Sequence, residues 1–310
     1  QQSNVTSNGA ITVAIIALEA FPGMWINAFL VCVLCIDWLK KKTLNSNEKI
    51  LLLLGCSRFC YLCTVWINVF LSNIFPYVFQ VHPIFQLLNG SYTFFNCFNL
   101  WVSACLCGFY CIKIATFRNR FFIYLKVKID RMVPWLLLGL VIFSLIFGIF
   151  VYNTIDKAVC KDLNSTCQGS LWKPTIRKEE HFFPIFFLTT FLHTTSFTAV
   201  IFSAVLLLFS LWRHERKMQT KSMKDLSMEA HIRAMKSILS FFIMYSINFM
   251  VLILTVIYSW KCQNQMIFLA YLIQHVYPGV HSLILIFSNP KLEKTPLRIL
   301  SCVKSKLCIR

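Results

Sequence analysis

The sequence is poor in charged residues, and above all in acidic ones. Only 14% of its 310 residues are charged, and 12 Asp and Glu oppose 30 Lys and Arg, for a net charge of +18. A soluble domain has about 25% charged residues, so a chain that is 57% hydrophobic cannot keep its whole surface in water. The basic residues fall in the gaps between apolar runs, which favours contact with membrane lipid over a nucleic-acid partner.

Motifs for catalysis and cofactor binding are missing as well. The chain has no Gly-rich phosphate loop, no His-Glu-x-x-His and no Gly-x-Ser-x-Gly. Glu19 is the only acidic residue within the apolar stretches, so paired-carboxylate chemistry has no support. His281 has no second His or Cys at metal-ligand spacing. We therefore expect no enzyme, no cofactor and no metal site.

Seven stretches are apolar and long enough to cross a bilayer, which takes about 20 helical residues each. They cover residues 10–36, 49–73, 84–113, 132–153, 182–212, 234–259 and 266–288. The alternating pattern of a membrane barrel is absent, and a lipid-exposed backbone must then satisfy its hydrogen bonds within helices. We predict an all-α membrane protein in which residues 1–310 form a single domain, a bundle of seven transmembrane helices.

The distribution of Lys and Arg predicts the orientation of this bundle. Of the 30, 23 lie after the first, third, fifth and seventh spans, six lie on the other side, and Arg58 lies within the second span. Cytoplasmic loops carry the excess of basic residues. The N-terminus is therefore expected outside and the C-terminus in the cytoplasm.

Cysteines and one sequon add detail to this topology. Buried free cysteine is a common apolar filler, and we expect that role for the nine within the spans: Cys32, Cys35, Cys56, Cys60, Cys63, Cys97, Cys105, Cys107 and Cys111. Cys160, Cys167 and Cys262 lie on the outer side, where disulfides form, and their pairing stays open. Asn164-Ser165-Thr166 is an N-glycosylation sequon in the long outer loop.

Arg58 is a charge in the middle of an apolar span, where it needs partners. Asn27 and Ser282 lie at similar depth and both offer oxygen acceptors. We predict a structural network of these three residues, joined in the seventh helix by His281 and by Pro278, which removes a helix hydrogen bond and favours a kink. Glu19 lies about 12 Å along the helix from Asn27, and its role is left open between a protonated side chain and a bond to the seventh helix.

Several motifs follow one another along the chain. Residues 51–58 read Leu-Leu-Leu-Leu-Gly-Cys-Ser-Arg, residues 109–115 read Phe-Tyr-Cys-Ile-Lys-Ile-Ala, and residues 277–282 read Tyr-Pro-Gly-Val-His-Ser. This set resembles the bitter taste receptor (taste receptor type 2) family of G-protein-coupled receptors. Similar patterns there are Leu-x-x-Leu-Ala-x-Ser-Arg, Phe-Tyr-x-x-Lys-Ile-Ala and Tyr-Pro-x-x-His-Ser. Asp-Arg-Tyr and Asn-Pro-x-x-Tyr, which mark rhodopsin-like receptors, are missing from the ends of the third and seventh spans.

Three positions depart from the family pattern. Met24 stands where the family usually has Asn, and Tyr92 stands where many members have Trp. Ser196 replaces a Pro of the fifth helix, although the following Phe197 is retained. The second and third changes put the shape of a ligand pocket in question.

The resemblance implies a chemosensory receptor of the plasma membrane that binds small organic bitter compounds and activates a gustducin-like heterotrimeric G protein. It places Tyr92 and Asn96 at ligand-contact positions, and residues three or four apart share a helix face. The candidate ligand contacts are Tyr92, Asn96, Leu188, Leu192, Tyr245, Phe249, Tyr271 and Gln274. The candidate G-protein contacts are Lys113, Arg118, His214, Lys217, His231 and Lys236.

Two alternatives remain at this point. A vomeronasal type 1 pheromone receptor has a similar architecture, but the motifs at Ser57-Arg58 and at residues 277–282 argue against it. A seven-helix transporter or channel belongs to another class, and the paired broken helices expected of a transporter are not apparent.

Overall fold

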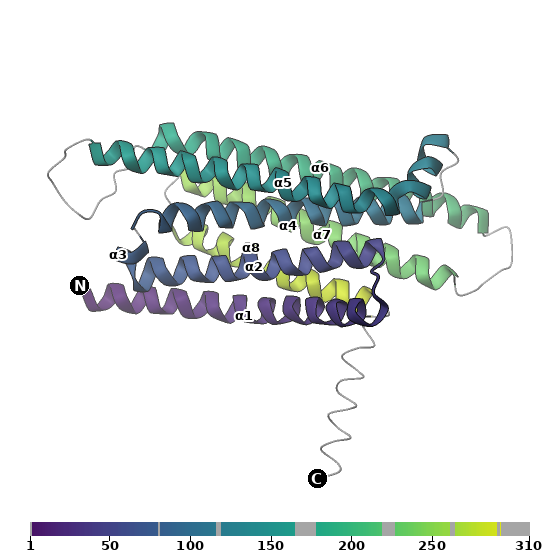
Figure 1. The fold of residues 1–310 in the computed structure, drawn as a ribbon, viewed down its shortest axis with the longest axis horizontal. Coiled ribbons are helices and arrows are strands. Elements are labelled where there is room, and N and C mark those ends of the chain that lie inside the picture. Colours follow the sequence, from purple (N-terminus) through teal and green to yellow (C-terminus); the bar gives the residue numbers. More distant parts are fainter. Residues whose placement is uncertain are drawn as a thin grey trace, which may run out of the picture.

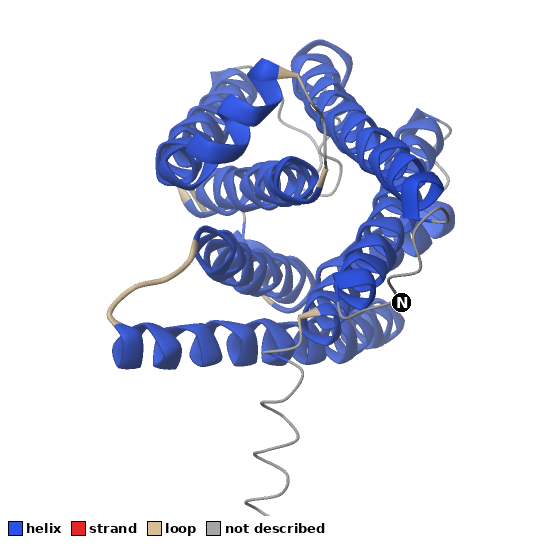
Figure 2. Ribbon diagram, turned by 90° about the vertical axis from the view of Figure 1, so that its right-hand side faces the viewer, coloured by secondary structure: helices blue, strands red, loops and turns tan. Residues whose placement is uncertain are grey.

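The computed structural model describes residues 2–79, 81–115, 119–164, 178–218, 227–260, 264–289 and 292. In this part of the chain the regular structure is entirely helical (Figure 2). The helices are α1 (Gln2–Lys41), α2 (Ser46–Ile74), α3 (Pro76–Phe79), α4 (Ile84–Ile114), α5 (Arg120–Asn164), α6 (Lys178–Met218), α7 (Ser227–Trp260) and α8 (Asn264–Ser288).

Each of the seven predicted spans lies inside one of the long helices, and only the four-residue α3 was not expected. Six helices contain a stretch long and apolar enough to cross a membrane: Gly9–Lys41, Ser46–Ile74, Ile84–Ile114, Arg120–Lys157, Phe187–Ser210 and Phe268–Ser288. In α7 the apolar stretch among the described residues is shorter, Phe242–Thr255. The chain is a multi-pass membrane protein whose helices are consistent with a seven-helix bundle.

The long helices run side by side along the long axis of the molecule (Figure 1). Contacts join α1 to α2, α2 to α4, α4 to α6, α6 to α7, α7 to α8, and α8 back to α1, which closes a ring. Helix α4 also contacts α5 and α7, so it is one of the central elements, together with α2, which also contacts α5 and α8. The polar side chains of α4 therefore meet other helices rather than lipid.

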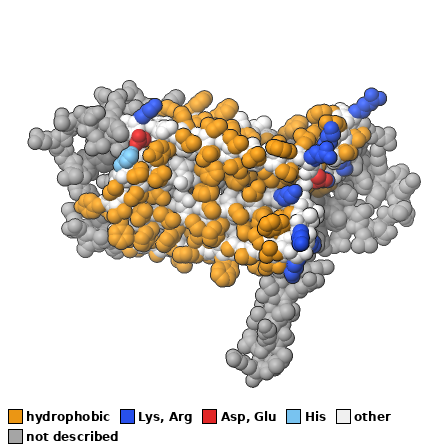
Figure 3. Space-filling model, viewed as in Figure 1, with side chains coloured by type: hydrophobic (Ala, Val, Ile, Leu, Met, Phe, Trp, Pro, Cys, Tyr) orange, Lys and Arg blue, Asp and Glu red, His pale blue; other side chains and the backbone are white. Residues whose placement is uncertain are grey.

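The surface carries a broad apolar band. In Figure 3 hydrophobic side chains cover the middle of the molecule, whereas most of the visible Lys and Arg side chains gather toward one end. Large apolar residues are well exposed, with Trp25 79%, Leu18 76% and Trp135 73% accessible. Apolar patches of this extent are unfavourable in water, but they match a lipid environment.

Two pairs of glycines allow helices to cross closely. A Cβ atom on Gly279 of α8 would lie 3.0 Å from the Cα atom of Gly23 in α1. A Cβ atom on Gly148 of α5 would lie 3.0 Å from the backbone oxygen of Gly90 in α4. Small residues let membrane helices pack backbone to backbone in this way, and the first crossing brings α1 and α8 together beside the polar network described below.

The prediction that the nine intramembrane cysteines are buried filler holds for three of them and is wrong for Cys32, which is exposed; the other five are partly buried. All nine of them are free thiols, and Cys97, Cys107 and Cys111 are buried. Cys107 and Cys111 belong to a core cluster together with Val200 and Leu207 of α6. They fill space between α4 and α6.

Candidate functional site

A polar network surrounds the guanidinium group of Arg58 in α2. Arg58 is fully buried, and its Nε atom donates a hydrogen bond to Asn99 Oδ1 at 3.0 Å. Nη1 donates to Ser282 Oγ at 2.7 Å, and Nη2 donates to Ser103 Oγ at 3.2 Å. Nη2 also contacts Nδ1 of His281. Side chains of α4 and α8 thus provide the partners that a charge inside a membrane protein requires.

The network reaches α1 through Ser282. The Ser282 hydroxyl donates to Asn27 Oδ1 at 2.7 Å, and Asn27 Nδ2 donates to the backbone oxygen of Gly23 at 2.8 Å. Asn27 and Ser282 are both fully buried. The structure therefore brings Asn27, Arg58 and Ser282 together, with Ser282 as the bridge that accepts from Arg58 and donates to Asn27.

Sequence reasoning did not assign Asn99 and Ser103 to this network. They are four residues apart in α4 and therefore share a face of the helix, and they are only 6% and 1% exposed. The sequence shows that both polar residues lie inside an apolar span. Which helix their shared face contacts depends on how the helices pack.

A small interior cavity adjoins the network. It is lined by Tyr61, Asn96, Asn99, Leu100, Tyr245, Asn248, Gln274, Tyr277 and Pro278. Its volume is about 10 Å³, close to the room needed by one water molecule, whereas small-molecule sites measure about 300–1,000 Å³. Three of the eight predicted ligand contacts, Asn96, Tyr245 and Gln274, line this cavity, and so does Pro278.

Two further ligand candidates lie beside the cavity walls. Tyr61 lines the cavity, and its hydroxyl donates to the hydroxyl of Tyr92 at 3.4 Å. The centroids of the two rings are 5.4 Å apart. Phe249 stacks on Phe197 of α6 with centroids 4.4 Å apart. Tyr92 therefore contacts a residue of the cavity wall, and Phe249 contacts a residue beside the wall. Neither Tyr92 nor Phe249 lines the cavity itself.

The remaining three ligand candidates lie elsewhere. Leu188 is partly buried and Leu192 is 6% exposed in α6, but neither lines the interior cavity. Tyr271 is 41% exposed on α8, and its ring stacks on His275 at 5.8 Å. In this arrangement of the helices, these side chains are not brought together with Asn96 and Gln274.

Ser196, which departs from the family pattern, has a definite partner. Its hydroxyl accepts a hydrogen bond from the Tyr245 hydroxyl at 2.9 Å and donates to the backbone oxygen of His193 at 3.0 Å. A proline has no hydroxyl to accept the first bond. The ring of Phe197 also stacks on Tyr245 at 6.2 Å. Ser196, in place of the family's Pro, therefore helps to orient Tyr245 in the wall of the cavity.

Aromatic contacts connect the cavity with the Arg58 network. The Tyr245 ring meets Tyr277 edge to face at 6.2 Å, and Tyr277 stacks on His281 at 5.6 Å. His281 in turn contacts the Arg58 guanidinium group. A continuous series of side chains thus leads from α7 through α8 to α2.

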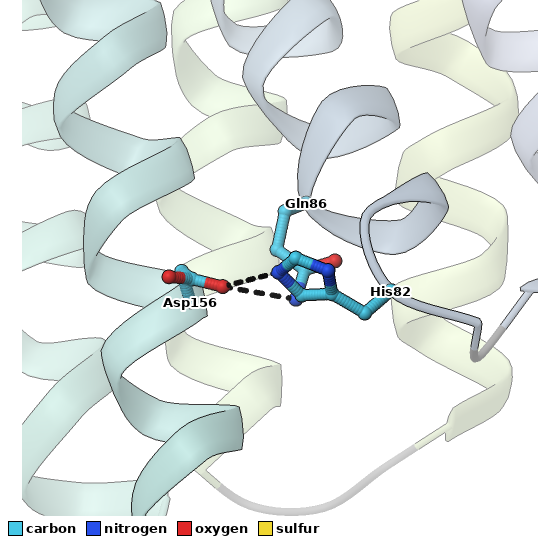
Figure 4. Close-up of polar contacts among 3 residues, drawn as sticks. All are labelled: His82, Gln86 and Asp156. Atoms are coloured by element: carbon cyan, nitrogen blue, oxygen red, sulfur yellow. Dashed lines mark hydrogen bonds and ion pairs between the residues drawn. The ribbon is translucent and has the colours of Figure 1, made fainter.

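One end of the bundle carries an exposed polar cluster (Figure 4). The Nε2 atom of His82 lies 2.8 Å from Asp156 Oδ1, and Gln86 Nε2 donates to the same oxygen at 3.4 Å. The His82 and Asp156 side chains are 57% and 33% exposed. Ion pairs this accessible contribute about 0–1 kcal/mol. The cluster therefore adds little to the packing of the start of α4 against the C-terminal part of α5.

At the opposite end, Lys113 of α4 pairs with Asp130 of α5. The Lys113 Nζ and Asp130 Oδ2 atoms are 2.5 Å apart, and both side chains are exposed. Lys113 is the G-protein candidate whose contacts are described. Arg118 lies outside the described residues, and so do the side chains of Asn164, His214, Lys217, His231 and Lys236.

A wider hollow of about 640 Å³ lies on α4 and α5. It is lined by Trp101, Arg131, Met132, Trp135, Leu136, Gly139, Leu140 and Phe143. None of the eight predicted ligand contacts is among them. Converging polar side chains, rather than volume, therefore make the interior cavity the better candidate for a specific ligand site.

The helical bundle, its apolar surface and its polar interior define a multi-pass membrane protein. Sequence comparisons are more specific. The family model described as "Taste receptor protein (TAS2R)" matches residues 5–304. The chain belongs to the taste receptor type 2 family. It is a receptor rather than an enzyme. Membership of this family decides against the two alternatives, a vomeronasal type 1 pheromone receptor and a transporter or channel.

Individual relatives cover nearly the whole chain. Taste receptor type 2 member 7 of Macaca mulatta is 32% identical over 310 residues, covering 98% of this chain and 96% of the relative. Taste receptor type 2 member 9 of Homo sapiens is 31% identical over 298 residues, covering 95% of each chain. Member 9 of Papio hamadryas is 30% identical and covers 96% of each.

Proposed function

We propose that this chain is a bitter taste receptor of the plasma membrane that binds small organic bitter compounds between α4, α6, α7 and α8. On binding, it activates a gustducin-like heterotrimeric G protein. The observation that carries the proposal is the interior cavity, where three predicted ligand contacts meet residues that also join the Arg58 network. Membership of the taste receptor type 2 family supports the same function.

The cavity walls suit a ligand with few polar groups. Asn96 and Gln274 each offer an amide with donors and an acceptor, and Tyr245 offers an aromatic face and a hydroxyl. Leu100 and Pro278 supply apolar surface. Sites of this composition bind mostly apolar organic molecules and orient them with one or two hydrogen bonds.

The small volume of the cavity suggests how binding is coupled to activation. A molecule larger than water does not fit in about 10 Å³, so a ligand must bind an arrangement in which α7 and α8 stand farther from α4. Such a ligand favours the wider arrangement by its differential affinity. The contacts from Tyr245 through Tyr277 and His281 to Arg58 then give the movement a route to the centre of the bundle.

The orientation of the chain follows from charge. Helix α1 ends with Lys40 and Lys41 in its last turn, and Lys113 lies in the last turn of α4. An excess of basic residues marks the cytoplasmic side. We therefore place the ends of α1, α4 and α6 and the start of α7 in the cytoplasm, where α4, α6 and α7 face the G protein.

A calcium assay tests this function. Cells that carry a promiscuous G protein and the surface-tagged chain are screened against a panel of bitter compounds. We expect dose-dependent responses to at least one compound, and none in cells that lack the G protein. Silence across the panel at normal surface level would count against the proposal, and ligand-gated current without the G protein would favour a channel.

Two matched variants locate the ligand. Leu100→Phe adds bulk to the cavity wall, whereas Leu283→Phe adds the same bulk at a position that is 39% exposed on α8. We expect the first to lower agonist potency and the second to leave it unchanged at equal surface levels. Equal potency in both variants would place the ligand elsewhere.

A further inference from the structure

A second hollow opens on the lipid-facing side of α7 and α8. Its volume is about 360 Å³, within the range of about 300–1,000 Å³ that small-molecule sites occupy. Four lining residues, Ile247, Leu269, Ile273 and Val276, are 39–52% exposed, so the hollow is reached from the bilayer. The other lining residues are Glu19, Met244, Asn248, Leu272 and Tyr277.

Three polar atoms of this lining have no hydrogen-bond partner among the described residues. They are Glu19 Oε2, Asn248 Oδ1 and the Tyr277 hydroxyl, and each is buried. Asn248 and Tyr277 are only 7% exposed as whole residues. Unpaired buried polar atoms are uncommon in native proteins, and each needs an explanation. Three around one hollow suggest a ligand that pairs with them.

The chemistry of these atoms selects the class of ligand. A carboxylate and an amide oxygen only accept hydrogen bonds, and a phenol also accepts. The complement is a head group with several N–H donors, and an ammonium group with a positive charge meets the carboxylate best because charge-assisted bonds are about twice as strong as neutral ones. The rest of the lining is aliphatic, so the body of the ligand must be apolar.

We propose that this hollow is a binding site for lipophilic amines. The protonated nitrogen lies against Glu19, Asn248 and Tyr277, and the apolar body lies along α7 and α8 toward the lipid. Glu19 comes from α1, which contacts α8 but not α7 in the described residues. An amine in this site therefore joins three helices through one head group.

The site is distinct from the interior cavity but shares a wall with it. Asn248 and Tyr277 line both spaces, whereas Glu19 lines only the lipid-facing one. Substitution of Glu19 therefore separates the two sites. Direct binding to the purified receptor needs no bitter agonist and no G protein, so the outcome is independent of the proposed function.

Binding of tritiated 4-phenylbutylamine to the full chain in phosphatidylcholine nanodiscs tests the proposal, with empty nanodiscs as the control for partition into lipid. 4-Phenylbutan-1-ol has the same skeleton without the charge and serves as the matched competitor. Glu19→Gln keeps the size of the side chain and removes its charge. Ile273→Trp fills the hollow, and Val280→Trp adds the same ring at an exposed position of α8 outside it.

We expect saturable binding of the amine that weakens at least about tenfold in Glu19→Gln, is lost in Ile273→Trp and is retained in Val280→Trp. The alcohol should compete for the site at least about tenfold more weakly than the unlabelled amine. Its affinity should be the same for the native chain and for Glu19→Gln. Non-saturable uptake that matches empty nanodiscs would overturn the proposal. Amine affinity within twofold of the native value in both Glu19→Gln and Ile273→Trp would do so too, as would a parallel loss of amine and alcohol in Glu19→Gln. If Glu19→Gln does not fold, the two tryptophan variants decide.

Discussion

The Ser282 hydroxyl should be among the most sensitive single groups in the bundle. It accepts from Arg58 at 2.7 Å and donates to Asn27 at 2.7 Å, in a fully buried position. Ser282→Ala removes both bonds and leaves an N–H of Arg58 and the Asn27 oxygen without this partner. The substitution changes only one atom in size, so packing of α8 against α1 is otherwise kept.

The magnitude follows from the two bonds. A side-chain hydrogen bond between membrane helices contributes about 0.6 kcal/mol on average and up to about 1.7 kcal/mol, and a bond to an ionised group is about twice as strong as a neutral one. We therefore expect Ser282→Ala to lower the free energy of unfolding by about 2–3 kcal/mol. At roughly 2–4 °C for each kcal/mol, Tm should fall by about 4–12 °C.

Thermal unfolding in nanodiscs, followed with a thiol-reactive dye, measures this loss because buried thiols such as Cys97 and Cys107 react only when the bundle opens. Ser203→Ala is the matched control, since the Ser203 hydroxyl donates within α6 to the backbone oxygen of Ala199 at 2.8 Å. Its Tm should change by less than about 2 °C.

A double-mutant cycle sharpens the test. Ser282→Ala and Asn27→Ala both remove the bond between these two residues, so their combined effect should fall short of the sum by at least about 0.5 kcal/mol. The reasoning is refuted if Ser282→Ala is no more harmful than Ser203→Ala, or if the two substitutions are additive.

Four further outcomes are expected. Tags at the two termini should be labelled from opposite sides of intact cells, and labelling of both from one side would rule out an odd number of spans. Glycosidase should increase gel mobility, and Asn164→Gln should remove most of that shift; an unchanged shift would place the sugar elsewhere. Gly279→Ala should lower Tm by several degrees, because the added Cβ atom would lie 3.0 Å from the backbone of Gly23. Gly139→Ala should leave Tm unchanged, because no atom lies within 4 Å of its Cβ position. Equal effects of the two substitutions would contradict the close helix crossing. Asn96→Ala should lower agonist potency about 5- to 150-fold through loss of a polar anchor worth about 1–3 kcal/mol, while Thr93→Ala on the same helix should not; unchanged potency at normal surface level would remove Asn96 from the site.

Much of the architecture was predictable because it depends on local properties of the chain. A membrane helix needs a run of apolar residues, and every run identified in the sequence lies within a long helix. Arg58 was identifiable as a residue that needs partners, since a charge inside an apolar span has few ways to be tolerated. The motifs at residues 51–58, 109–115 and 277–282 together carried the family resemblance without any structure.

The partners of these residues depended on the tertiary structure. Helical periodicity tells which residues share a face, but not which helix that face meets. For this reason Asn99 and Ser103 were not assigned to Arg58, although their spacing was visible. The same limit applied to Tyr271, which shares a helix face with Gln274 by spacing but is 41% exposed while Gln274 is buried.

The sequence by itself therefore determined the apolar helices, the uneven distribution of basic residues and the family, because these are properties of composition and of motifs along one chain. Packing of seven helices decided the rest. The close crossing at Gly23 and Gly279 brings α1 against α8 beside the Ser282 bridge. The packing of α8 against both α1 and α7 places Glu19 at a hollow with Asn248 and Tyr277, since contacts between distant segments arise only when the bundle closes.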